Sequence, residues 1–264
     1  MPLARADLES LLRARKLDRT LTTSLPSAPS PDELPAPPDI APPDIIAATG
    51  LPAFDARLGG GFPRGHLSEL VGLRSSGRTS VLLQALAAAT ARSELVALID
   101  ALDMLDVASA SAAGIDLDRF LWIRGHVVTN PGMCRDINQR ALEQAVKALT
   151  LVLQAGNFGS VVLDVAEAPK DAIRRLPFTT WLRLQRIIEG SQTACLLVGT
   201  EPMARSSAGL TVRLITAHAR LRADKRLLAG LDLEVQVVRA RARMHENTPE
   251  KNPVAVTTCA AAYV

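Results

Sequence analysis

Residues 72–80 constrain this chain more than any other part of its sequence. They read Gly-Leu-Arg-Ser-Ser-Gly-Arg-Thr-Ser and lie between an apolar run, residues 66–71, and a segment rich in alanine and leucine. This order predicts a strand, a glycine loop and a helix. The loop matches the phosphate-binding P-loop pattern GxxxxGK[ST], except that Arg78 stands where the pattern has lysine.

A P-loop binds phosphate through backbone N–H groups, which two glycines bring close to the anion at the positive end of a helix. Its lysine reaches the β- and γ-phosphates, and its hydroxyl residue binds magnesium. A guanidinium keeps the charge of the lysine but is planar and bulkier, so we expect no required cofactor and at most weak binding of ATP and magnesium. The candidate nucleotide-binding residues are Gly72, Ser75, Ser76, Gly77, Arg78, Thr79, Ser80 and Asp164.

Composition narrows the class of protein. The 264 residues, of which 48% are hydrophobic, suit one domain of moderate size with appendages. Because no apolar run approaches 18 residues and the N-terminus has no signal-peptide core, we expect a cytoplasmic protein without a membrane partner. The three cysteines are far apart, which argues against a disulfide framework or a zinc site.

Four divisions of the chain are predicted. Residues 1–20 hold a short amphipathic helix, and residues 21–45 form a proline-rich, extended linker. The core spans residues 46–243, and a loosely structured tail spans residues 244–264. The helix either docks on its own core or is tethered for a partner.

Within the core, apolar runs alternate with helical patterns. Strands are predicted at residues 95–100, 120–124, 160–164 and 194–198, with helices at 79–92, 135–155 and 179–189 between them, and two further strands follow at 211–217 and 231–238. This alternation predicts an α/β fold, a mostly parallel sheet with helices on both faces and an antiparallel extension. Asp164 ends its strand where a magnesium-directing acid belongs relative to a P-loop.

The core resembles the RecA recombinase family. The residues that carry the resemblance are Thr49-Gly50, the segment 55–65, Ser75-Ser76-Gly77, the strand end 98–101 and the segment 113–118. The resemblance implies that Leu102 replaces the glutamate that activates the attacking water, and that Ser109 replaces a tyrosine stacked on adenine. Together with Arg78, these departures predict a protein that has lost ATP turnover.

The same resemblance implies that the chain contacts single-stranded DNA. In RecA the segments after the strands that here end at Asp164 and Val198 become the single-strand-binding loops, and here they carry Lys170, Arg174, Arg175 and Arg205. These four residues are the candidate DNA contacts, and the alternative is that they are solvated surface residues without a ligand.

A shortened RecA-like core with altered catalytic positions is similar to the ImuA family of bacterial proteins. That resemblance implies a non-catalytic accessory protein of the SOS DNA-damage response, one that acts in DNA repair and mutagenic translesion synthesis. Its implied partners are an ImuB-like polymerase homologue, an error-prone DnaE-type polymerase and RecA, with single-stranded DNA as a further ligand.

Two alternatives stay open. The first is an ATP-dependent RecA-type recombinase or regulatory ATPase, in which Arg78 replaces the lysine and Asp103 serves as the base. The second is a regulator that caps RecA filaments without turnover.

Overall fold

The structure is a computed structural model that describes residues 45–125, 135–205, 208–221, 228–241 and 254–256. The predicted N-terminal helix, the linker up to residue 44 and all of the tail except residues 254–256 lie outside the described residues. The described residues all lie in one compact unit of the chain.

The predicted alternation of strands and helices is present, and short elements that were not predicted, such as α6, lie between them. In chain order they are β1 (Ile46–Ala47), α2 (Pro52–Leu58), β2 (Phe62–Pro63), β3 (Leu67–Gly72), α3 (Arg78–Ala91), β4 (Val96–Asp100), α4 (Val107–Ala112), a 3₁₀ turn (Leu117–Arg119), β5 (Phe120–Arg124), α5 (Arg135–Ala155), β6 (Ser160–Asp164), α6 (Lys170–Arg175), α7 (Phe178–Ile188), β7 (Ala194–Gly199), β8 (Ala208–Leu221), β9 (Leu228–Ala240) and β10 (Val254–Val256).

The described strands build an eight-stranded sheet in the order β10-β9-β8-β3-β7-β6-β4-β5. From β8 to β5 all neighbours are parallel, whereas β9 runs antiparallel to β8 and β10 antiparallel to β9. The predicted mostly parallel sheet with an antiparallel extension is therefore confirmed. The strand before the glycine loop, β3, lies inside the sheet between β7 and β8.

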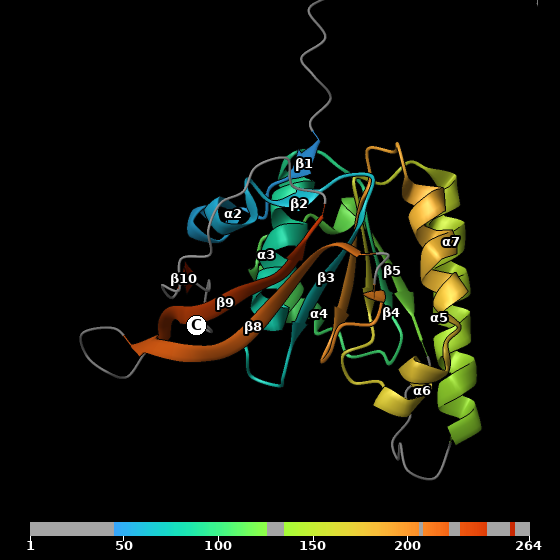
Figure 1. Ribbon diagram of the computed structural model, residues 1–264. Coiled ribbons are helices and arrows are strands. Elements are labelled where there is room, and N and C mark those ends of the chain that lie inside the picture. Colours follow the sequence, from blue (N-terminus) through green and yellow to red (C-terminus); the bar gives the residue numbers. More distant parts are fainter. Residues whose placement is uncertain (1–44, 126–134, 206–207, 222–227, 242–253, 257–264) are drawn as a thin grey trace, which may run out of the picture. The chain divides into compact units, whose positions relative to one another are not determined.

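Helices cover both faces of the sheet, as expected for parallel strands (Figure 1). On one face, α3 packs with residues such as Leu70, Leu98 and Val162 in one core. On the other face, α5 and α7 pack with alternate residues of the same strands, such as Ile99 and Leu163, in a second core. Because alternate side chains of one strand enter the two cores, both faces are buried, and central strands such as β7 are apolar along their whole length.

The antiparallel strands extend beyond their predicted bounds. Strands β8 and β9 are longer than the segments 211–217 and 231–238 because their pairing continues to Leu221 and Leu228, past the buried part of the hairpin. Within the predicted tail, Val254–Val256 pairs with Leu231–Leu233 as an edge strand. In the described part of the chain, no helix has the length and apolar character needed to span a bilayer.

Candidate functional site

The glycine loop joins β3 to α3 and needs both of its glycines. A Cβ atom on Gly72 would lie 2.4 Å from the Ser76 hydroxyl oxygen. Gly77 has a φ of +83° and caps α3, and a Cβ there would lie 2.4 Å from a methyl carbon of Leu233 on β9. The loop thus requires glycine at the two positions where a P-loop has it, and β9 packs directly against the loop.

Arg78 is the first residue of α3, and its side chain is directed into the protein. It is only 6% exposed. Its guanidinium donates hydrogen bonds to the carbonyl oxygen of Gly72 and, at 3.2 Å, to that of Gly199. Because Gly72 ends β3 and Gly199 ends the neighbouring β7, the arginine joins the ends of two parallel strands.

A carboxylate, Glu167, lies beside the loop. It accepts a hydrogen bond from Nε of Arg74 at 3.0 Å, and its other oxygen lies 3.9 Å from the Arg78 guanidinium. Glu167 is thus paired with two arginines from the segment that would hold phosphate. The carboxylate therefore offsets part of the positive charge that these arginines would offer to an anion.

A cavity of about 200 Å³ lies between the loop and the carboxyl ends of β4 and β6. Leu102 and Ser109, the two altered positions of the resemblance, both line it. The remaining lining residues are Arg78, Thr79, Leu82, Leu83, Leu98, Asp100, Met104, Leu105, Asp106, Asp164, Ala166 and Glu167. The cavity therefore has leucine side chains, four carboxylates and one arginine, Arg78, whose guanidinium is bound to backbone carbonyl groups.

Asp100 and Asp164 are paired neighbours at the ends of β4 and β6. Asp164 accepts the N–H of Ala166 at 2.9 Å. Burial raises the pKa of Asp164 to about 6, although the Ala166 hydrogen bond and the charge of Arg78 act in the opposite direction. Asp100 accepts the N–H of Leu105 at 2.8 Å, so its carboxylate is part of the turn after β4.

Asp103, the alternative base, does not line the cavity. Its two oxygens accept hydrogen bonds from Arg124, both at 2.7 Å, and this pairing lowers the pKa of Asp103. The guanidinium of Arg124 also lies 4.6 Å from the ring centre of Trp122. A carboxylate bound in this way is poorly placed to accept a proton from water.

Ser109 has a structural role within α4. Its N–H donates to the side chain of Asp106 at 2.9 Å, so Asp106 caps the helix. The hydroxyl of Ser109 donates to the same carboxylate. Among the described residues that line the cavity none is aromatic, so none of them offers a ring for an adenine base.

The predicted DNA contacts fall into two groups. Lys170, Arg174 and Arg205 line a second pocket, whereas Arg175 is exposed on α6 and does not line it. Lys170 and Arg174 both pair with Glu201. Sequence reasoning did not find Glu201 or Glu167, because nothing in the sequence indicates which carboxylate a surface cation will meet.

The central strand, its glycine loop and the paired aspartates define an α/β protein of the P-loop type. Residues 44–173 match the model of the RecA N-terminal domain family. The chain is 37% identical over 131 residues to Protein RecA of Mycolicibacterium gilvum and 36% identical over 131 residues to that of Corynebacterium jeikeium. Each match covers 49% of this chain and only 33% and 31%, respectively, of the relative.

A solved structure of the RadB recombinase shares the fold. It superimposes with a TM-score of 0.55 over 80% of this chain and 96% of that chain, at 16% identity. The family match and the relatives support a RecA-like assignment for residues 44–173, and the RadB structure supports the fold.

Proposed function

We propose that this protein is a non-catalytic RecA-like accessory protein of DNA repair. It acts in the DNA-damage response and mutagenic translesion synthesis as a docking or regulatory subunit. The observation that carries the proposal is the commitment of the Arg78 guanidinium to the carbonyl oxygens of Gly72 and Gly199. The residue that would bind phosphate is used instead to hold the loop's own strand.

The surroundings of Arg78 oppose a bound nucleotide. Turning its side chain toward a phosphate leaves the Gly72 and Gly199 carbonyls without this donor, at a cost of about 1–3 kcal/mol for each buried group. Glu167 lies 3.9 Å from the Arg78 guanidinium and offsets part of its charge, which weakens its attraction for a phosphate. The cavity of about 200 Å³ is also smaller than the roughly 300–1,000 Å³ of pockets that hold drug-sized ligands.

Neither of the two positions considered for the catalytic base provides one at this cavity. Leu102 lines the cavity and cannot accept a proton, and Asp103 is bound to Arg124 outside it. Each missing group of this kind is expected to raise the barrier to phosphoryl transfer by several kcal/mol.

The similarity to RecA and the resemblance to the ImuA family support a proposal about which proteins this chain binds. We include RecA, an ImuB-like polymerase homologue and a DnaE-type polymerase in the proposal. Mixing the protein with RecA on single-stranded DNA and measuring filament length tests the first of these. Filaments of unchanged length would remove RecA from the set.

Nucleotide binding is the sharpest test of the proposal. We expect millimolar Mg-ATP to leave the melting temperature of the full chain unchanged, because only a ligand that binds the folded state stabilises it. A RecA protein serves as the positive control. Arg78→Lys is the matched variant, and a gain of ATP-dependent stabilisation in it shows that the arginine is what excludes the nucleotide.

One observation favours the ATP-dependent alternative. Thr79, the residue that would bind magnesium, lines the cavity, and the loop keeps its glycine geometry. If the alternative holds, ATP raises the melting temperature and single-stranded DNA stimulates hydrolysis that Asp164→Ala abolishes. That pair of results would overturn the non-catalytic proposal.

A further inference from the structure

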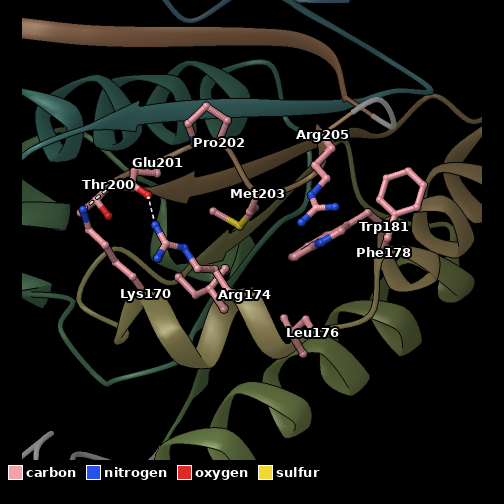
Figure 2. A pocket seen from close by; sticks show the side chains of 11 residues that line it. Lys170, Arg174, Leu176, Phe178, Trp181, Thr200, Glu201, Pro202, Met203 and Arg205 are labelled. Carbon is pink, nitrogen blue, oxygen red and sulfur yellow. Dashed lines mark hydrogen bonds and ion pairs between the residues drawn. The ribbon is translucent and has the colours of Figure 1, made fainter.

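A second cavity lies beside α6 and the start of α7 (Figure 2). This α6–α7 pocket has a volume of about 160 Å³ and is formed by α6, the start of α7 and the segment after β7. Its lining residues are Lys170, Ile173, Arg174, Leu176, Phe178, Trp181, Thr200, Glu201, Pro202, Met203 and Arg205.

The floor of the α6–α7 pocket is apolar and its rim is cationic. Trp181 is 3% exposed and Met203 is 7% exposed, and Leu176 lies with them in the core of the α5–α7 face. The charged lining residues are three cations and the single carboxylate of Glu201, which leaves an excess of two positive charges. An apolar floor under a positive rim suits a ligand that is both apolar and anionic.

The charges of the rim are not equivalent. Glu201 pairs with Lys170 and, at 3.3 Å, with Arg174, so these two cations share one carboxylate. Figure 2 shows Arg205 on the other side of Met203, with its guanidinium pointing toward the ring of Trp181. In the described ranges of the chain Arg205 has no ion-pair partner, and it is therefore the cation best placed to receive an incoming carboxylate.

Buried hydrogen bonds fix the wall of the pocket. The carboxylate of Glu69, which is fully buried on β3, accepts the N–H groups of Met203 and Ala204 at 2.6 and 2.7 Å. Its other oxygen accepts the Thr211 hydroxyl at 2.7 Å. The segment after β7 is therefore held before any ligand arrives, which lowers the entropic cost of binding.

We propose that the α6–α7 pocket binds a short peptide segment of a partner protein, one that carries a large apolar side chain next to a carboxylate. The apolar side chain fills the space over Trp181 and Met203, and the carboxylate pairs with Arg205. The inference deepens the proposed accessory function by giving it a docking site, and in that respect it rests on that proposal.

The geometry favours a peptide over single-stranded DNA. A strand of DNA is bound by a groove of cations along its backbone and by exposed aromatic faces on which bases stack. Here the cavity accommodates a single side chain, and Trp181 is too buried to offer a face to a base. Two of the three cations are already neutralised in part by Glu201.

The test uses the full chain labelled with ¹³C at its methionine methyl groups, because the Met203 methyl reports on the pocket directly. Met203→Leu assigns its resonance. The probe is a twelve-residue glycine–serine peptide with Asp-Phe-Asp at its centre. We expect a saturable shift of the Met203 signal, with affinity at least about tenfold weaker when both aspartates are lysine or when phenylalanine is alanine.

Two protein variants locate the contact. Arg205→Glu is expected to weaken binding of the probe by about tenfold or more. Arg175→Glu makes the same charge change on α6 outside the pocket, and we expect less than about a threefold effect. The peptide variants leave the protein untouched, so the result does not depend on the stability of either protein variant.

Three outcomes overturn the inference: no Met203 shift at millimolar peptide, an equal shift with the lysine peptide, or a Met203 shift produced by a twelve-residue oligothymidine and not by the peptide. The last would assign the pocket to DNA. Mg-ATP stabilisation, measured on the same protein, reports on the non-catalytic proposal alone, so the two proposals can fail separately.

Discussion

The guanidinium of Arg78 donates a hydrogen bond to the carbonyl oxygen of Gly199 at 3.2 Å, across 121 positions of the chain. The bond ties the start of α3 to the end of β7, and a second bond from the same group ties it to the end of β3. The residue that departs from the P-loop pattern is therefore part of the framework of the fold.

Replacing this arginine should destabilise the protein. We expect Arg78→Met to lower the free energy of unfolding by about 2–4 kcal/mol, because two buried carbonyl groups lose a charged donor. Urea denaturation measures the change. Arg74→Met is the matched control, since Arg74 pairs with the same Glu167 but is solvent-exposed, and its loss should cost less than about 1 kcal/mol. Equal effects of the two variants would contradict this role.

Glu69 should tolerate glutamine and not leucine. The amide oxygen of Glu69→Gln can still accept the N–H groups of Met203 and Ala204, so we expect a loss of at most about 1 kcal/mol. Glu69→Leu leaves both N–H groups buried without an acceptor and should cost about 3 kcal/mol or more. Denaturation gives both free energies, and faster amide exchange at residues 203 and 204 in the leucine variant identifies the segment affected.

Asp164 should make stability depend on pH. Its folded-state pKa of about 6 lies above the ordinary 3.8, so the unfolded chain ionises first as the pH rises. Below about pH 4, protonated Asp164 contributes up to about 3 kcal/mol to the free energy of unfolding. This contribution is lost as the pH rises to about 6–7. In Asp164→Asn this loss is absent, so the stability difference between variant and wild type should grow in favour of the variant from pH 4 to 7. Parallel curves would show that Asp164 is not perturbed.

Gly77 should not accept a side chain. Gly77→Ala places a Cβ in a left-handed backbone conformation and against Leu233, so we expect a cost of about 2–3 kcal/mol. Leu233→Ala in the same chain removes the contact and leaves the backbone strain. The double-mutant cycle should therefore show a coupling of about 1 kcal/mol or more between the two sites. A cycle without coupling would mean that the loop moves away from β9.

Local patterns were sufficient to predict the sheet. The bounds of β5, α5 and β6 agree with the segments predicted at residues 120–124, 135–155 and 160–164, because an apolar run or a helical period marks each one. The hairpin of β8 and β9 was underestimated, since its outer part is held by backbone pairing and has exposed side chains such as Leu221.

The site was less predictable than the fold. The glycine loop and Asp164 were found because their positions follow from a motif. Glu69 carries no such signal, since it lies in an apolar run and its partners are 134 to 142 positions away. The pairing of Asp103 with Arg124 is likewise a tertiary contact, and only the structure shows that this carboxylate is already bound.

Hydrogen bonds hold the segment from Gly199 to Ala204 at both ends, from Arg78 at one end and to Glu69 at the other. Both bonds are made by side chains of the protein itself, so neither is lost when a small molecule dissociates. If a partner binds this segment, the conformation that it binds would not depend on the ATP concentration in the cell. Occupancy would then depend on the concentrations of the two proteins and on their affinity.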